Sequence, residues 1–300
     1  MKKIKDIRHT ISTMRLPFVI LTPACVLLGF GTAVWSSSHI RILHFILALI
    51  GAVAAHISVN AFNEYFDFKS GLDSLTRKTP FSGGSGALQQ KPELARWALS
   101  YALIAFAITS FIGIYFLIVR GLWLLPLGLI GLIVVTIYTT HIVRNPFLCL
   151  IAPGLGFGTL MVMGTHYVLT GSYSWTAFVA SLVPFFLVSN LLLLNQFPDV
   201  EADRSVGRKH FPILIGRRAS SLIYGAFILM PFVAIIMSVD FGYLPHAALI
   251  SLFALIVAIP AAFGAYRHAD ETGKLIPYMG LNVLTNLLTP VLVSIGLLIG

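Results

Sequence analysis

The chain has 300 residues, of which 57% are hydrophobic and only 10% are charged, whereas soluble domains contain about 25% charged residues. Its mean hydropathy is +0.90, and apolar runs of about 20 residues, enough to cross the hydrocarbon core of a bilayer as a helix, recur along the whole sequence. These values exclude a soluble protein, and the runs lack the period of two that marks barrel strands. We therefore predict an all-α polytopic membrane protein, a single domain over residues 1–300 in contact with the lipid bilayer. The net charge of +9 is taken as a signal of membrane orientation, and no nucleic acid is expected as a partner.

The apolar runs predict nine transmembrane helices. Their expected bounds in chain order are 17–35, 42–66, 97–118, 122–140, 147–170, 174–197, 219–239, 243–266 and 277–299. With a cytoplasmic N-terminus, 18 of the 20 Lys and Arg residues fall on the cytoplasmic side, and only Arg41 and Arg120 fall outside. Cytoplasmic loops of membrane proteins are rich in Lys and Arg. The distribution supports both the span count and this orientation in a cell (inner or plasma) membrane.

An acidic cluster lies at the end of the second predicted span. Glu64, Asp67 and Asp73 fall within ten residues, in a chain with only 11 Asp and Glu residues. Asn63 and Asp67 are four residues apart, so their side chains share one face of a helix. Asp73 follows Gly71 and is expected in the loop, where it either folds back onto a bound metal ion or caps the turn.

A second cluster follows the sixth predicted span. Asn195, Asp199 and Asp203 repeat the four-residue spacing, and corresponding residues of the two clusters are 132 positions apart. That offset contains four predicted spans. We therefore expect two four-helix pseudo-repeats plus one last helix, with both clusters on the cytoplasmic side. Pro198 is expected to kink or end the helix within this cluster.

Two long cytoplasmic loops, about 67–96 and 199–218, carry cations beside the clusters. The first contains a glycine-rich stretch, which is either a phosphate-binding loop or a flexible connector. Basic side chains near the clusters are candidates for binding a diphosphate: Lys69, Arg77, Lys78, Arg208 and Lys209.

Amide and carboxylate oxygens are ligands that Mg²⁺ prefers. Two such clusters that face each other across a cavity would hold two ions with a diphosphate between them, and the cations would complete a clamp for an anionic leaving group. A second interpretation is that these are helix-end charges solvated at the membrane surface, which the repeated spacing disfavours. A secondary transporter is the alternative function, although transporters place charged groups near the middle of the membrane.

The paired Asn-x-x-x-Asp clusters resemble the two aspartate-rich motifs of the UbiA-type intramembrane prenyltransferases, and the resemblance covers nearly the whole chain. It implies nine helices around a central cavity, Mg²⁺-dependent binding of an isoprenyl diphosphate, and transfer of the isoprenyl chain to an acceptor. It places five residues on the metal and diphosphate positions of the family: Asn63, Asp67, Asn195, Asp199 and Asp203. It also implies catalytic roles for Asp67, Asp199 and Tyr138. Supporting positions around the metal are expected at Asn60, Glu64, Asp73 and Arg144.

Within that family, residues 60–67 and 80–84 look most like the 1,4-dihydroxy-2-naphthoate (menaquinone) branch and its archaeal-type relatives. Glu64 stands where aspartate is usual, and the fifth span lacks an acidic residue associated with the naphthoate enzymes. The expected acceptor is therefore aromatic, 1,4-dihydroxy-2-naphthoate or a similar quinone precursor. The alternatives are 4-hydroxybenzoate, a glycerol-phosphate lipid and a tetrapyrrole.

The expected reaction needs a dry cavity, because ionisation of an allylic diphosphate leaves a carbocation that water would quench and that aromatic faces stabilise. Tyr138 matches a tyrosine in the fourth span of the family and is expected to stabilise the cation. Tyr65, Phe66 and Tyr167 are further aromatic candidates, and packing between helices is the alternative for each of them. His56 in the second span either makes an interhelical hydrogen bond or lines the cavity.

Overall fold

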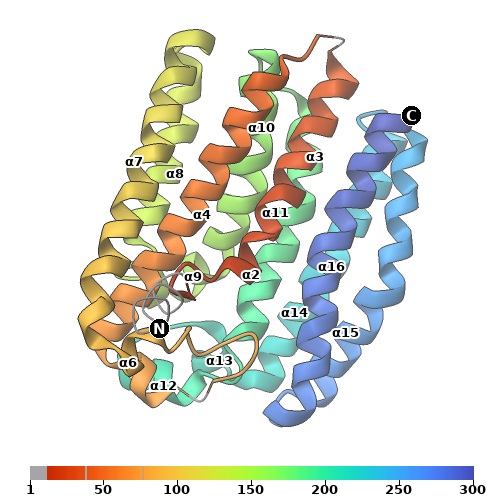
Figure 1. The fold of residues 1–300 in the computed structure, drawn as a ribbon. Helices are drawn as coiled ribbons and strands as arrows, with labels where there is room; N and C mark the ends of the chain where they lie inside the picture. Colours follow the sequence, from red (N-terminus) through yellow and green to blue (C-terminus); the bar gives the residue numbers. More distant parts are fainter. Residues whose placement is uncertain (1–11, 38, 77) are drawn as a thin grey trace, which may run out of the picture.

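The computed structural model describes residues 12–37, 39–76 and 78–300, and all regular structure in them is helical. Long helices run side by side in one bundle (Figure 1). The helices that cross the bundle are α2 (Leu16–Val19) with α3 (Leu21–Ser36), α4 (Ile42–Ser70), α7 (Ala95–Arg120), α8 (Leu125–Ile137), α9 (Pro146–Gly154) with the π-helical turn η4 (Leu155–Leu160) and α10 (Met161–Thr170), α11 (Trp175–Asn195), α14 (Gly216–Asp240), η5 (His246–Ala254) with α15 (Leu255–Arg267), and α16 (Thr272–Ile299). Short helices lie between them: α5 (Leu72–Leu75), α6 (Ala87–Gln90), η1 (Pro92–Leu94), η2 (Leu122–Leu124), η3 (Ile142–Arg144), α12 (Val200–Ser205) and α13 (Phe211–Leu214).

Eight helices among the described residues are long and apolar enough to cross a membrane. Each coincides with one of the nine predicted spans. The remaining prediction, 122–140, corresponds to a shorter apolar helix over Leu122–Ile137, which rises about 24 Å at 1.5 Å per residue, less than the roughly 30 Å of a hydrocarbon core. The membrane-protein class is therefore confirmed, whereas the count of nine full-length spans is not.

Helices α4 and α7 pack closely because α7 presents small residues to α4. Ala95, Ala98, Ala102 and Ala105 are buried at intervals of three and four residues along α7. Two of the apolar clusters that contain these alanines also contain side chains of α4. In lipid, where apolar burial does not drive helix association, small side chains allow the close backbone contact that does.

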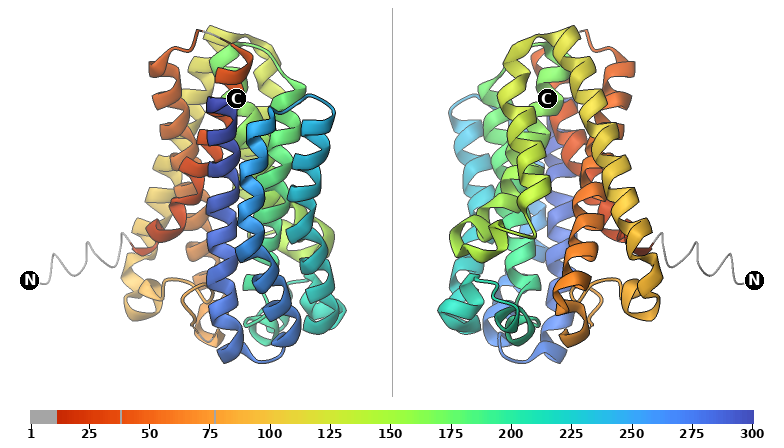
Figure 2. Two further views of the ribbon diagram at one scale, coloured as in Figure 1. Left: turned by 90° about the vertical axis from the view of Figure 1, so that its right-hand side faces the viewer. Right: turned by 90° about the vertical axis from the view of Figure 1, so that its left-hand side faces the viewer.

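The last helix packs on the first, which closes the arrangement into a ring. Helix α16 contacts α3 as well as α15, and neighbouring helices along the chain contact each other. Figure 2 shows η5 and α15, one after the other, beside α16 along the bundle. Gly264 permits this approach, because a Cβ there would lie 2.1 Å from the Tyr278 ring. The largest apolar cluster joins α3, α11, α14, α15 and α16, with Leu28 and Ile228 fully buried in it.

The short helices α6, α12 and α13 gather at one end of the bundle (Figure 1), which we call the motif end. Three expected boundaries at this end differ from the structure. Helix α4 continues past its predicted end at 66 to Ser70, so the first loop begins only at Gly71; Asp73 lies on the short helix α5 and not in a loop. The second loop is also shorter than predicted, because α14 already begins at Gly216.

Candidate active site at the motif end

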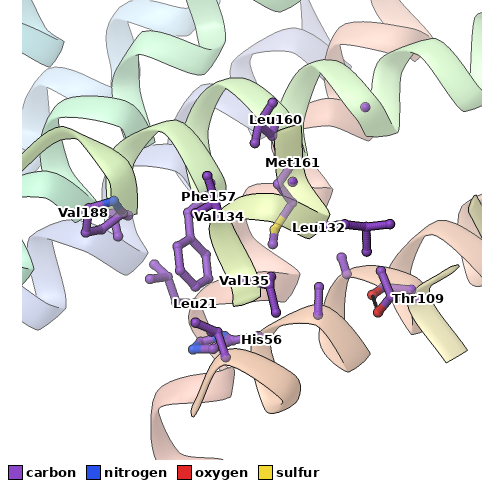
Figure 3. A pocket seen from close by; sticks show the side chains of 18 of the residues that line it. Leu21, His56, Thr109, Leu132, Val134, Val135, Phe157, Leu160, Met161 and Val188 are labelled. Carbon is purple, nitrogen blue, oxygen red and sulfur yellow. Dashed lines mark hydrogen bonds between the residues drawn. The ribbon is translucent and has the colours of Figure 1, made fainter. Parts of the chain in front are cut away.

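A cavity of about 540 Å³ lies within the ring of helices. Its wall is mostly apolar, and Figure 3 shows leucine, valine, phenylalanine and methionine side chains around part of it. Polar side chains on the wall are few: Arg15, His56, Asn60, Asn63, Thr109, Ser110, Tyr138, Thr165, Asn195 and Asn286. An apolar pocket with a small number of placed polar groups is typical of a small-molecule site.

The first motif lies on uninterrupted α4. Asn63 lines the cavity, and its Oδ1 accepts a hydrogen bond of 3.0 Å from Thr139 Oγ1. Asp67 follows one turn later on the same face and is buried, with only 5% of its surface accessible. The predicted common orientation of Asn63 and Asp67 thus agrees with the helix that carries them.

Glu64 connects the first motif to its surroundings. Its Oε1 accepts from Arg15 Nε and from the Ser85 backbone N–H, each at 2.7 Å, and its Oε2 accepts from Ser85 Oγ at 2.7 Å. Both carboxylate oxygens are therefore engaged by protein donors. Asn60, one turn earlier, donates from Nδ2 to the Met14 carbonyl at 3.1 Å. These two residues attach the N-terminal segment and the glycine-rich loop to α4.

Asp73 faces the same region from α5. Its Oδ2 is buried without a hydrogen-bond partner among the residues the structure describes. A Cβ on Gly84, which has a φ of +67°, would lie 2.8 Å from Asp73 Oδ1, so the loop can approach this carboxylate only with glycine there. Burial, followed by repulsion from Glu64 and Asp67, raises the pKa of Asp73 to about 7.

The second motif crosses a break in the helix. Helix α11 ends at Asn195, and Asp199 precedes the first residue of α12, as expected beside Pro198. The Asp203 backbone N–H donates to the Asp199 carbonyl at 2.8 Å. Burial and the neighbouring Asp203 raise the pKa of Asp199 to about 7, and a hydrogen bond from Ser82 offsets part of this rise. Asn195 Oδ1 and Asp199 Oδ1 are buried with no partner in the described part of the chain.

Arg208 joins the two motifs. Its Nη2 donates to Asp67 Oδ1, and its Nη1 donates to Asp203 Oδ1 at 3.1 Å. Burial alone would lower the pKa of Arg208, but the Asp67 and Asp203 carboxylates outweigh it and raise that pKa. Two acidic patches that lie far apart in the sequence therefore meet around one guanidinium group.

Sequence reasoning missed several residues that support this cluster. His210 Nε2 lies 2.9 Å from Asp203 Oδ2, and the ring is buried. Arg15, which pairs with Glu64 49 residues away, has a left-handed backbone conformation with φ 49°, a strained state that is common at functional sites. The contact of Arg15 follows only from tertiary structure. The position of His210, seven residues after Asp203 and beyond the end of α12, has no helical periodicity that could have indicated its contact.

Of the four predicted diphosphate-binding cations in the described part of the chain, only Arg208 lies in the cluster. The Lys69 Nζ lies 5.8 Å from the Tyr65 ring centroid, in a separate pocket between α4 and α7, and its expected contact with a diphosphate stays a prediction. The other two described lysines and Arg144 have exposed side chains: Lys78, Lys209 and Arg144. Arg77 lies outside the described residues.

Tyr138 is the only one of the four aromatic candidates that lines the cavity. It is within electrostatic reach of Arg208, Asp67 and Asp203. The other candidates pack elsewhere: Tyr65 and Phe66 lie against the contact between α4 and α7, and the Tyr167 hydroxyl donates to the Arg120 carbonyl at 3.2 Å. Packing between helices, the alternative interpretation, therefore describes these three.

The donor set at the motif end fits a divalent cation. Among the described residues, no group of three or more His, Cys, Asp and Glu side chains is already arranged around one point. However, three buried oxygens without protein partners, Asp73 Oδ2, Asn195 Oδ1 and Asp199 Oδ1, lie in the two motifs. Hard oxygen donors of this kind suit Mg²⁺ with some of its waters retained.

An all-helical membrane bundle with an apolar cavity and two facing oxygen-donor motifs defines a class of protein that binds a charged group and an apolar chain together. The UbiA prenyltransferase family matches residues 22–284, and the chain belongs to this family. It is therefore an integral-membrane prenyltransferase, as the first of the two predicted functions expects.

Curated relatives cover most of the chain. It is 27% identical over 297 residues to the 1,4-dihydroxy-2-naphthoate octaprenyltransferase of Bacillus subtilis (strain 168), which covers 97% of this chain and 90% of that protein. It is 25% identical over 236 residues to the digeranylgeranylglyceryl phosphate synthase of Thermococcus kodakarensis, covering 77% of this chain and 76% of that protein. The resemblance expected from the motifs is thus confirmed at the level of the family.

Solved structures show the same fold. A UbiA homolog from Aeropyrum pernix K1 superposes with a TM-score of 0.72 at 18% identity, covering 94% of this chain and 98% of that one. A UbiA homolog from Archaeoglobus fulgidus bound to GPP and Mg²⁺ superposes with a TM-score of 0.67 at 16% identity, covering 95% and 99% of the two chains. The all-α architecture expected from the sequence is therefore that of the family.

Proposed function

We propose that the chain transfers an isoprenyl group from an isoprenyl diphosphate to an aromatic acceptor, 1,4-dihydroxy-2-naphthoate or a similar quinone precursor, with Mg²⁺ as cofactor. The observation that carries the proposal is the meeting of the two motifs around Arg208, beside an apolar cavity. The name of the Bacillus subtilis relative supports the acceptor, and the homolog bound to GPP and Mg²⁺ supports the donor and the cofactor.

The cation would be held by the motif oxygens of five residues: Asn63, Asp67, Asn195, Asp199 and Asp203. Among these, Asn195 Oδ1 and Asp199 Oδ1 have no partner in the described part of the chain, and Asp73 Oδ2 is a further oxygen without one. The oxygens of Asn63 and Asp203 would first have to exchange their present hydrogen bonds for the cation. When bound, Mg²⁺ neutralises charge that develops on the departing diphosphate. Arg208 is the protein group best placed to donate hydrogen bonds to the same diphosphate, because it lies between the motifs and remains positively charged. Its bonds to Asp67 and Asp203 keep the guanidinium oriented for that role.

The cavity wall provides the other requirements of the reaction. The allylic carbon loses its bond to the diphosphate oxygen, and the electron pair leaves with the diphosphate. Tyr138, on the cavity wall near Arg208, presents an aromatic face to the resulting cation. The apolar wall excludes water, so an electron-rich acceptor ring forms the new carbon–carbon bond instead. The substituted ring carbon then releases its proton, or its carboxylate as carbon dioxide, which restores the aromatic ring.

We further propose that the motif end is cytoplasmic and that residues 1–300 form one domain in the cell membrane. Support comes from the distribution of Lys and Arg, with 18 of 20 assigned to the cytoplasmic side under this orientation. Labelling of single cysteines introduced at Lys209 and at Trp123, with a reagent that does not cross membranes, tests it. In intact cells the Trp123 position is expected to react and the Lys209 position is not.

Mass spectrometry of lipid products tests the reaction. Purified protein would receive geranyl diphosphate, Mg²⁺ and one of three acceptors: 1,4-dihydroxy-2-naphthoate, 4-hydroxybenzoate or geranylgeranylglyceryl phosphate. We expect a prenylated naphthalene product that disappears with EDTA. The second candidate is the glycerol-phosphate lipid, because the Thermococcus kodakarensis relative is named for that activity. Product from that acceptor alone would replace the first candidate, and product without Mg²⁺ would contradict the cofactor.

A further inference from the structure

A polar stripe runs along α4 from the motif end into the cavity. His56, Asn60, Asn63 and Asp67 are separated by four, three and four residues, so they share one face of the helix. The first three line the cavity. The proposed function uses Asn63 and Asp67, and Asn60 is engaged by the Met14 carbonyl. His56 remains, about 10 Å along the helix from Asn63 at 1.5 Å per residue.

The His56 ring is fixed at one nitrogen and open at the other. Its Nδ1 lies 2.8 Å from Thr22 Oγ1, a hydrogen bond between α4 and α3. No hydrogen bond to its Nε2 is formed by any residue that the structure describes. The side chain lines the cavity and keeps 6% of its surface accessible. Both predicted roles of His56, an interhelical bond and a place on the wall, therefore hold.

Phe157 fixes the orientation of the imidazole from the opposite side. The two rings pack edge to face, with centroids 4.6 Å apart and planes at 77° (Figure 3). Phe157 belongs to the π-helical turn η4, a local irregularity that is frequent at functional sites. This turn lies directly on α11, because a Cβ on Gly158 would be 2.5 Å from the Phe185 backbone nitrogen. The glycine therefore helps to place Phe157 beside His56.

The side chains labelled beside His56 in Figure 3 offer no hydrogen-bond partner for Nε2. Figure 3 shows apolar side chains near it, including those of Leu21 and Val135. An isoprenyl chain contains only carbon and hydrogen, so it cannot provide a hydrogen bond either. A buried polar nitrogen left unpaired when a ligand displaces water is unfavourable. A substrate group that displaces water from His56 is therefore favoured when it carries a hydroxyl or similar polar atom.

We propose that His56 is a positioning residue for the acceptor, with Nε2 hydrogen-bonded to a hydroxyl group of the aromatic ring. The bond fixes how the ring faces the diphosphate site at the motif end. This inference rests on the proposed function, since it assigns a contact to the acceptor of that reaction. Thr22 and Phe157 act through His56, because they set the position of its ring.

Steady-state kinetics with two substrates tests the proposal. The variants are His56→Leu, which removes the bond, and His56→Asn, which keeps a polar group of smaller size. The donor is geranyl diphosphate, and the acceptors are 1,4-dihydroxy-2-naphthoate and its two mono-O-methyl ethers. We expect His56→Leu to raise the acceptor KM about tenfold, the range for loss of one buried hydrogen bond, with the donor KM unchanged within about twofold. His56→Asn is expected to recover part of the loss.

The methyl ethers distinguish a direct bond from a structural role. One ether is expected to be a poorer acceptor than the parent for the wild type, but an equally good one for His56→Leu, because the bond is already absent. Ser58→Ala is the matched control: Ser58 lies on the same helix but donates to the Ala102 carbonyl of α7 at 2.9 Å, so both KM values should stay near wild type.

Three results would separate the possible failures. A wild type that prenylates none of the aromatic acceptors overturns the proposed function itself. A wild type that is active, with an acceptor KM unchanged in His56→Leu, overturns only the role of His56. Equal rises in both KM values, with the same methyl-ether discrimination as the wild type, would also overturn it, because a general change of cavity shape produces that pattern.

Discussion

In the first motif, Asn63 and Asp67 lie on adjacent turns of the continuous helix α4, whereas in the second motif α11 ends at Asn195 and Asp199 follows a turn. The same four-residue spacing is therefore carried by two different backbones. The first motif is oriented by its helix, with Thr139 on Asn63 and Arg208 on Asp67 as additional contacts. The second depends on side chains from elsewhere: Ser82 on Asp199, and Arg208 and His210 on Asp203.

The comparison teaches that a repeated spacing predicts which residues form the motifs better than it predicts the contacts that hold those residues in place. Helical periodicity explains how Asn63 and Asp67 share a face. It does not explain the second motif, where the Arg217 Nε donates to the Phe197 carbonyl at 2.7 Å and thereby holds the turn after α11. We therefore expect the two motifs to contribute equally to catalysis, but the second motif to depend more on side chains from other segments.

The largest expected effect is the loss of activity when one aspartate is removed from either motif. Asp67→Ala and Asp199→Ala should each reduce kcat about 100-fold or more, because each removes a carboxylate from the site where charge is stabilised. Initial rates with labelled geranyl diphosphate measure this. Glu201→Ala is the control, since that side chain is 71% exposed two residues from Asp199, and it should remain near wild type. An effect confined to one aspartate would show that the motifs are not equivalent.

The second largest effect is expected when Arg208, which pairs with Asp67 and Asp203, is replaced. Arg208→Gln leaves the carboxylates of Asp67 and Asp203 buried without their cation, a defect that typically costs about 3–5 kcal/mol. We expect the apparent Tm in EDTA to fall by about 5–10 °C, and Mg²⁺ to raise the Tm of this variant more than that of the wild type, because the metal replaces the lost charge. Thermal unfolding in detergent measures both. Arg204→Gln, at an exposed position, is the control and should change neither value. If Mg²⁺ raises the Tm of the wild type and both variants equally, the metal does not replace the charge of Arg208.

Replacement of His210 tests whether the second motif depends on a supporting side chain. His210→Ala removes the bond to Asp203 Oδ2 and should raise the Mg²⁺ concentration for half-maximal activity about tenfold, as expected when a ligand loses its supporting contact. The kcat at saturating Mg²⁺ should change much less. His210→Asn, which can still donate, should recover part of the affinity. If the Mg²⁺ requirement is unchanged, the second motif does not need this support.

The smallest effect is expected in the glycine-rich loop beside the first motif. Gly84→Ala and Gly71→Ala both introduce a side chain at a positive φ, but only at Gly84 would the new Cβ meet Asp73, at 2.8 Å from Oδ1. Both should lose about 1 kcal/mol of stability from the backbone conformation. Only Gly84→Ala should also lower activity, by a few-fold. Equal activity of the two variants would show that the loop does not need to approach Asp73.

The membrane class, the helix positions and the main motif residues could be predicted from the sequence, because the length of apolar runs and the distribution of charge can be read locally along the chain. Asn63 and Asp67 were predictable for the same reason, since both lie on one regular helix. The contacts of Arg15 and His210 were not, because they depend on segments that meet only after packing. Lys69 shows what closeness in sequence does not determine: it is two residues from Asp67, but its Nζ lies beside the Tyr65 ring in a separate pocket between α4 and α7.

The wall formed by η2 and α8 has a consequence for the size of the substrate. Helix α8 buries none of its residues, yet Leu125, Leu129 and Leu132 lie along the cavity. The bilayer therefore begins one helix away from the reacting groups on this side. We therefore expect an isoprenoid that is too long for the 540 Å³ interior to extend beside this short helix into the acyl chains, so that longer donors are accepted without a larger cavity.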